Sequence, residues 1–323
     1  SDVYKRQIKS SADRSFSFDT SRASNMSESD ISHRFIINDS GVRGQWTLLD
    51  ASYQTVLAKH DYPLEIQSVL GEMMAASILL TATLKFEGSM TIQARGKGNV
   101  SLLSVECTHD QKLRAIARWE GDTRGLDFQG MLGQSTLAIT ITPQQGERYQ
   151  GIVPLDRATL AECLEEYFGS SEQLRTQIKL FHGNNRAGGL LLQVLPTHSG
   201  IKIAEEKQQE EWERMTTLAS TLTAEELLNL DCATVLHRLF HEEQVELYPA
   251  EPVVFECSCS RQRTADALVQ VSRAELEEII AEQGHIEVTC QFCNEQYRFD
   301  AVDVTLLFTA ASPGDTSEDK TIN

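Results

Sequence analysis

Apolar and polar residues alternate along much of the first two hundred residues of this 323-residue chain. A period of two is the pattern of strands that bury one face, and turns that contain glycine separate several of these runs. This combination predicts a sheet of mainly antiparallel neighbours. The strands expected from the pattern are 33–38, 90–94, 100–105, 113–119, 136–141, 149–153, 177–181 and 190–195.

Helices are expected at three places between these strands. Asp50 precedes a short helix, Pro63 opens a long apolar one that ends near Phe86, and a third covers about 157–168. The apolar run 69–84 contains an acidic residue and is short for a membrane span, so we interpret it as a buried helix. The segment therefore predicts an α+β domain that is long enough to bury a core.

A strongly acidic stretch follows this domain. Residues 205–256 carry thirteen Asp and Glu against three Lys and Arg. Thr223-Ala-Glu-Glu226 is a capping box, and apolar residues follow it at near-helical spacing over 227–240. We interpret the stretch as an amphipathic helical linker whose charge opposes compaction. The alternative is an ordinary helical hairpin packed on the core.

Four of the seven cysteines form two tight pairs, Cys257-Ser-Cys259 and Cys290-Gln-Phe-Cys293, with thirty residues between the pairs. Four thiolates that converge make a closed tetrahedral zinc site with Zn–S bonds of about 2.3 Å. A module of about sixty residues has too small a core to be secure without such a staple. Freed from metal, the cysteines within each pair are also close enough to oxidise. The pairs therefore predict one zinc ion per chain, with Cys257, Cys259, Cys290 and Cys293 as both metal ligands and redox-active groups.

Two roles are open for such a site. Closed four-cysteine sites are usually structural, so a static zinc ribbon is one interpretation. A redox switch is the other, because a disulfide within a C-x-C pair is strained and easily reduced. The acidic segment directly before the site would also lose its packing partner if the module unfolded.

Capping signals predict the elements around these cysteines. Ser260 is expected to cap one helix, and Ser272 begins a capping box for a second helix that ends at Gly284. Strands 286–290 and 296–299 flank the second cysteine pair. That pair is therefore expected in the turn of a hairpin.

These patterns divide the chain into five parts. Residues 1–25 are expected to be a non-native or disordered leader, because they are polar and have no periodicity. The α+β core spans 26–200, the metastable acidic linker 201–250, and the zinc-binding module 251–310. Residues 311–323 form a polar tail.

Charge and cysteine usage narrow the class of protein. With 29 Lys and Arg against 47 Asp and Glu the net charge is −18, and such a polyanion repels nucleic acid. The remaining cysteines, Cys107, Cys163 and Cys232, stand singly and are expected to be small buried hydrophobic residues. A secreted framework would pair its cysteines throughout, so we expect a cytoplasmic protein that neither spans a membrane nor binds nucleic acid.

Several longer motifs carry a family resemblance. They are His60-Asp-Tyr-Pro63, Leu80-Thr-Ala-Thr-Leu-Lys-Phe86, Gly146-Glu-Arg-Tyr-Gln-Gly151, Ala187-Gly-Gly-Leu-Leu-Leu-Gln-Val194 and the two cysteine pairs. Through them, from His33 to about Pro313, the chain resembles the redox-regulated chaperones of the thirty-three-kilodalton heat-shock protein family. It departs from the family at Ser260-Arg-Gln-Arg263, where Ser-Arg-Glu-Arg is common, and this departure involves no metal ligand.

The resemblance implies an ATP-independent holdase and not an enzyme. It implies that the reduced form binds zinc through the four cysteines and is inactive. Hypochlorous acid, or peroxide with heat, would convert the pairs to Cys257–Cys259 and Cys290–Cys293 disulfides, release the zinc and unfold the module and linker. The exposed surface would bind unfolding client proteins. The resemblance further implies a homodimer joined through the core, and transfer of clients to ATP-driven foldases after reduction.

Two functions of other classes compete with this one. A thiol–disulfide oxidoreductase would use Cys290-x-x-Cys293, but such an enzyme has this motif at a helix N-terminus and not on a hairpin. A static zinc ribbon that binds nucleic acid would use the basic spot at Arg261 and Arg263, but the net charge of −18 opposes it.

Overall fold

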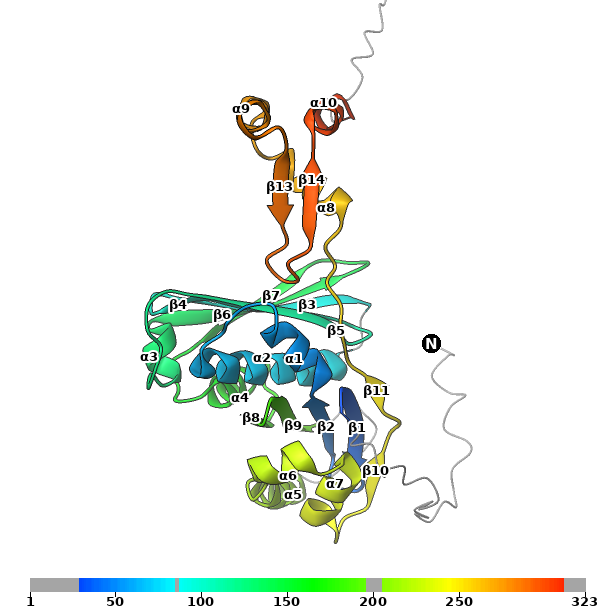
Figure 1. Cartoon of the computed structure of the whole chain (residues 1–323). Helices are drawn as coiled ribbons and strands as arrows, with labels where there is room; N and C mark the ends of the chain where they lie inside the picture. Colours follow the sequence, from blue (N-terminus) through cyan, green and yellow to red (C-terminus); the bar gives the residue numbers. More distant parts are fainter. Residues whose placement is uncertain (1–28, 85–86, 196–204, 311–323) are drawn as a thin grey trace, which may run out of the picture.

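The computed structural model describes residues 29–84, 87–195 and 205–310, and two six-stranded sheets face each other across a layer of helices (Figure 1). In the first sheet the order is β10 (Val245–Leu247), β1 (Ile31–Ile37), β2 (Val42–Leu49), β9 (Arg186–Val194) and β8 (Thr176–Gly183), with β11 (Glu251–Pro252) also on β1. In the second the order is β12 (Val254–Phe255), β5 (Lys112–Trp119), β4 (Val100–Thr108), β3 (Gly88–Gly96), β6 (Ser135–Pro143) and β7 (Tyr149–Pro154). All pairs are antiparallel except β12 with β5, so the predicted α+β class is confirmed.

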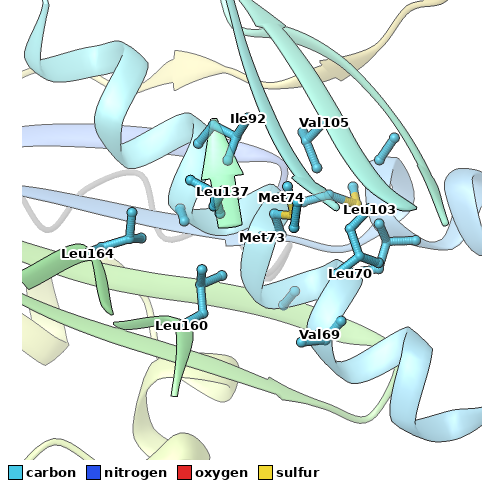
Figure 2. Packing of buried hydrophobic residues seen from close by; sticks show 14 of the residues in the cluster. Val69, Leu70, Met73, Met74, Ile92, Leu103, Val105, Leu137, Leu160 and Leu164 are labelled. Atoms are coloured by element: carbon cyan, nitrogen blue, oxygen red, sulfur yellow. The ribbon is translucent and has the colours of Figure 1, made fainter. Parts of the chain in front are cut away.

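Helix α2 (Leu64–Thr83) lies between the sheets and forms the centre of the larger core. Figure 2 shows Leu70, Met73 and Met74 of this helix beside Leu103 of β4. The helix is long and apolar enough to span a membrane by composition alone, but 72% of its most apolar window is buried inside the protein. It is the buried helix that the sequence predicts, and it ends three residues before the expected Phe86.

The other helices of this layer are shorter. They are α1 (Ala51–Leu57), α3 (Phe128–Leu132) and α4 (Leu160–Ser170). The helix expected over 157–168 corresponds to α4, whose cap is Thr159. Strand β2 was not predicted, although its apolar residues Val42, Trp46 and Leu48 alternate with polar ones in the sequence.

Three helices cover the face of the first sheet that points away from α2 (Figure 1). These linker helices are α5 (Glu205–Ala219), α6 (Ala224–Asn229) and α7 (Cys232–Phe240). They bury a second hydrophobic cluster with Phe35 and Trp46 of the sheet. The acidic stretch is therefore helical, as predicted, and lies packed on the core in this structure.

A narrow segment, residues 245–255, connects the linker helices to the C-terminal part of the chain, and we call it the strap. Its strands β10 and β11 pair with β1, and β12 pairs with β5, so the strap follows the edges of both sheets (Figure 1). Val253, between them, is 3% exposed. The expected start of the zinc module, residue 251, falls within this strap.

The cysteine module, residues 256–310, lies on the far side of the second sheet from α2 (Figure 1). It consists of α8 (Arg261–Leu268), α9 (Arg273–Gln283), β13 (Ile286–Thr289), β14 (Gln296–Phe299) and α10 (Ala301–Ala310). Its core is small: among the side chains that the structure describes, six hydrophobic residues are buried, including Leu276 and Phe299. Helix α10 was not expected, because its apolar run shows no clear helical period. Residues 1–25 and 311–323, expected as leader and tail, lie outside the described residues.

The predicted capping signals are all present. Both capping boxes form, at Thr223 for α6 and at Ser272 for α9. Ser260 accepts a hydrogen bond from the Arg263 amide at the start of α8. Gly284 ends α9 with a φ of 76°, a left-handed conformation that glycine adopts without strain.

Candidate metal centre

The two cysteine pairs meet at one point in the cysteine module. The Sγ atoms of Cys257, Cys259, Cys290 and Cys293 all lie within 4.8 Å of one another. Cys257 and Cys290 are 3.7 Å apart at sulfur, and Cys259 and Cys293 are 3.3 Å apart. Tetrahedral bonds of about 2.3 Å place sulfurs about 3.8 Å apart, whereas a disulfide needs about 2.0 Å. The four free thiols are therefore positioned to hold a metal ion.

The first pair is presented by extended backbone between β12 and α8. Cys259 directly precedes Ser260, the residue that caps α8. The start of this helix therefore fixes the backbone position of Cys259. The Arg263 guanidinium donates to the Ser258 carbonyl at 2.8 Å and holds the residue between the two cysteines. Local hydrogen bonds thus orient both sulfurs towards the hairpin.

The second pair lies in the turn between β13 and β14, as predicted. The Cys290 amide donates to the Glu295 carbonyl and the Asn294 amide donates to the Cys290 carbonyl, both at 2.8 Å. Asn294 has a φ of 63°, a conformation that asparagine tolerates better than most residues. Cys293 is therefore on a hairpin turn and not at a helix N-terminus, where an oxidoreductase would place it.

Hydrogen bonds and burial shift the pKa of Cys257 in the opposite direction to the pKa of Cys259 and Cys293. Burial opposes ionisation of Cys257, but hydrogen bonds from the Cys259 amide and the Arg114 guanidinium outweigh it and lower the pKa to about 7. Burial raises the pKa of Cys259 and of Cys293. The Tyr297 hydroxyl donates to Cys259 Sγ at 3.1 Å, which raises the pKa of that tyrosine.

The hairpin turn that carries the second pair of cysteines contacts the core. His60 Nε2 donates to the Gln291 carbonyl at 2.8 Å, and the Asn294 side-chain amide donates to the Lys59 carbonyl at 2.6 Å. The Arg118 guanidinium donates to the Gln291 side chain. The sequence marked His60 only as part of a family motif and predicted none of these contacts, because each joins residues more than 170 positions apart.

The remaining cysteines are buried, as predicted. Cys107, Cys163 and Cys232 are 0%, 2% and 1% exposed. Burial raises the pKa of the Cys107 thiol to about 12 and also raises that of Cys163. Cys107 and Cys163 are therefore poor nucleophiles at neutral pH.

A second cluster of reactive side chains joins α2 to β8. The Ser68 hydroxyl is hydrogen-bonded to His182 Nε2, and His182 Nδ1 lies 3.3 Å from Glu72 Oε1. The order resembles that of a hydrolase triad, and no sequence motif marked it. However, Ser68 lies inside helix α2, whose own hydrogen bonds occupy the amides on either side of it. Those amides cannot form an oxyanion hole.

Comparisons with known proteins agree with one another. A family model described as "Hsp33 protein" matches residues 30–300. A 33 kDa chaperonin of Ectopseudomonas mendocina is 51% identical over 285 residues, which cover 87% of this chain and 96% of the relative. One of Pseudomonas aeruginosa is 50% identical over 296 residues, covering 91% and 99%. The crystal structure of the 33 kDa chaperonin of Thermotoga maritima superposes with a TM-score of 0.73 at 22% identity, over 87% of this chain and 98% of that one, and it shows the shared fold.

Proposed function

The chain belongs to the Hsp33 family of chaperones, and on this basis we propose that it is a redox-regulated, ATP-independent holdase. The observation that carries the proposal is the convergence of four cysteine sulfurs in a module that rests on the core. A reduced, metal-bound form is inactive, and oxidation of the cysteines activates the protein.

Zinc is the metal that this donor set fits. Four thiolates at tetrahedral spacing suit Zn²⁺, which has no redox chemistry of its own and would act here as a structural staple. Cys257, Cys259, Cys290 and Cys293 hold it in the reduced protein. Because the module buries few hydrophobic residues, its folding depends on these four ligands.

Oxidation removes the ligands in two steps. In each step two thiolates give up two electrons and form a sulfur–sulfur bond. The oxidant, for example hypochlorous acid, takes up these electrons and is reduced to chloride and hydroxide. The products are the Cys257–Cys259 and Cys290–Cys293 disulfides. With no thiolate left to bind metal, the module loses its staple and unfolds.

Unfolding reaches the linker through the strap. Residues 201–250 form the metastable linker, and 251–310 form the redox sensor. The strap pairs with the edge strands β1 and β5, so it connects the linker helices on one side of the core to the module on the other. Release of the linker helices exposes the apolar face that includes Phe35 and Trp46. This face is a surface for unfolding client proteins.

The remaining parts of the proposal follow from the family. The core, residues 26–200, joins two chains into a homodimer when the protein is active. After reduction, clients pass to ATP-driven foldases. The reducing cytoplasm is the compartment in which the four thiols stay free and oxidation acts as a signal.

The test compares reduced, metal-loaded protein with protein treated with hypochlorous acid. Aggregation of a heat-unfolded client and the release of zinc are measured in the same samples. We expect suppression of aggregation only after oxidation, with about one zinc released per chain. Equal behaviour of both forms would make the metal site purely structural. Turnover in an insulin-reduction assay would instead favour an oxidoreductase.

A further inference from the structure

Arg114, on strand β5 of the core, reaches the candidate metal centre. Its Nη1 atom lies 3.7 Å from Cys257 Sγ, and its Nη2 atom lies 2.7 Å from Glu106 Oε2. The same guanidinium lies over the ring of Phe292, 4.3 Å from its centroid. The side chain is 15% exposed. One core residue therefore contacts the first cysteine pair and the loop of the second.

The charge of a four-thiolate site explains why a cation belongs there. Four thiolates and one divalent metal ion carry a net charge of −2. A positive group next to a sulfur offsets this charge, most strongly where water is largely excluded. Groups that donate to metal ligands in this way tune the ligands and orient them, and their loss typically weakens metal binding by about 10- to 100-fold.

Arginine is suited to all three contacts at once. Its planar guanidinium presents several N–H donors in a fixed fork and can stack on an aromatic ring. The Glu106 carboxylate, on the neighbouring core strand β4, forms an ion pair with the guanidinium and fixes its orientation. The guanidinium is therefore already oriented for its contacts with the Cys257 sulfur and the Phe292 ring.

We propose that Arg114 is a positioning residue of the metal centre, supplied by the core and not by the cysteine module. It holds Cys257 and the Phe292 loop in the metal-binding arrangement and offsets the charge of the thiolates. This inference rests on the proposed function, in which the four cysteines bind zinc. Metal retention and docking of the module are then coupled, and each strengthens the other by the same factor.

The test measures zinc affinity of the reduced full-length chain by competition with a chelator. We expect Arg114→Met to weaken zinc binding by about 10-fold or more, and Arg114→Lys to weaken it less, because the charge remains without the fork. Arg118→Met is the matched control, because it removes a docking contact that is made to the Gln291 side chain and not to a sulfur. Its zinc affinity is expected to fall less than that of Arg114→Met, because it weakens docking without removing a cation from sulfur.

Two further measurements separate electrostatics from simple loss of packing. In cobalt-substituted protein, the sulfur-to-metal charge-transfer band is expected to shift in Arg114→Met and not in Arg118→Met, because only the first loses a cation at sulfur. The double variant Glu106→Gln with Arg114→Met removes the carboxylate that the single variant leaves without its arginine. It is expected to recover part of the affinity, and it serves as the second variant if Arg114→Met folds poorly.

The outcomes are distinct. If Arg114→Met and Arg118→Met have the same zinc affinity and the same cobalt spectrum, Arg114 is only a docking contact and the inference is overturned. If the unaltered protein binds zinc tightly but is not activated by oxidation, the proposed function fails while the role of Arg114 at the metal stands on these same measurements. If the unaltered protein binds no metal, both are overturned.

Discussion

Leu227 of helix α6 occupies the space in front of Gly188 on strand β9. A Cβ atom at Gly188 would lie 2.5 Å from Leu227 Cδ2 and 2.7 Å from the Thr47 carbonyl oxygen. The absence of a side chain at this position therefore lets the linker approach the sheet closely. Arg186, nearby on the same strand, donates to the Leu228 carbonyl at 3.0 Å and holds the same helix.

Truncation of Leu227 is predicted to loosen the linker. The side chain is fully buried, and removal of a buried leucine side chain typically costs about 2–5 kcal/mol. Because the lost packing is in α6, the linker should detach more easily. We therefore expect the reduced Leu227→Ala protein to suppress client aggregation in part, without any oxidation. Amide hydrogen exchange should become faster in 205–240 and stay slow in α2.

Glu225→Ala is the matched control for this prediction, since Glu225 is an exposed residue of the same helix. It should keep the reduced protein inactive. A Leu227→Ala protein that is less stable throughout but still inactive when reduced would contradict the placement of the switch in the linker.

Removal of metal is predicted to unfold the cysteine module before the core. Zinc contributes an apparent free energy of about 10–16 kcal/mol in small thiolate sites, and the hydrophobic core of this module, as far as the structure describes it, has six buried residues. A chelator under reducing conditions should abolish amide protection in β13 and β14, while α2 remains protected. Retention of protection in both strands would show that the module folds without metal.

Loss of the α9 cap is predicted to weaken zinc binding without touching a ligand. The Ser272 hydroxyl accepts from the Glu275 amide, and an N-cap substitution by alanine typically costs about 1 kcal/mol. If module folding and zinc binding are one equilibrium, Ser272→Ala should lower zinc affinity by about fivefold in chelator competition. Thr159→Ala, which removes the cap of α4 in the core, should destabilise the core and leave zinc affinity unchanged. Equal zinc affinities of the two variants would argue against coupling.

Glu165 is predicted to reduce core stability at neutral pH. Its carboxylate accepts from the Ile178 amide at 2.7 Å, but burial outweighs this bond and raises the carboxyl pKa in the folded state. A raised pKa favours folding while the group is protonated, and that advantage is lost as pH rises through the folded pKa. Glu165→Gln should therefore have the higher free energy of unfolding at neutral pH.

The difference between Glu165→Gln and the unaltered protein should narrow as the pH falls below the usual carboxyl range, where both side chains are neutral. Denaturant unfolding at several pH values measures it. Lower stability of the variant at neutral pH would mean that the charged hydrogen bond to Ile178 outweighs burial.

Most elements of the core were predictable because their burial pattern is local. Strands such as β3 and β6 bury alternate residues, and that period is visible in the sequence. Strand β2 was not predicted, although Val42, Trp46 and Leu48 show the same alternation and pack beneath the linker helices. Only tertiary structure buries the polar residue Gln45 of this strand, because α2 lies over it.

The candidate metal site was predictable in its ligands but not in its surroundings. Two close cysteine pairs can reach one point with only two helices and one strand between them. Arg114 could not be assigned to the site, because 143 residues separate it from Cys257. Its side chain reaches the sulfur only because β5 pairs with the strap.

The sequence by itself determined most helices and strands, the capping residues of several helices, and which four thiols can share a metal, although β2 and α10 were not predicted. These properties depend on hydrogen bonds and side-chain periods within a few residues, which the order of residues specifies directly. Tertiary structure alone decided that the linker lies against Gly188 and that a core arginine completes the environment of Cys257. Such contacts join residues far apart in the chain, and they exist only when the packing of both sheets brings those residues within reach.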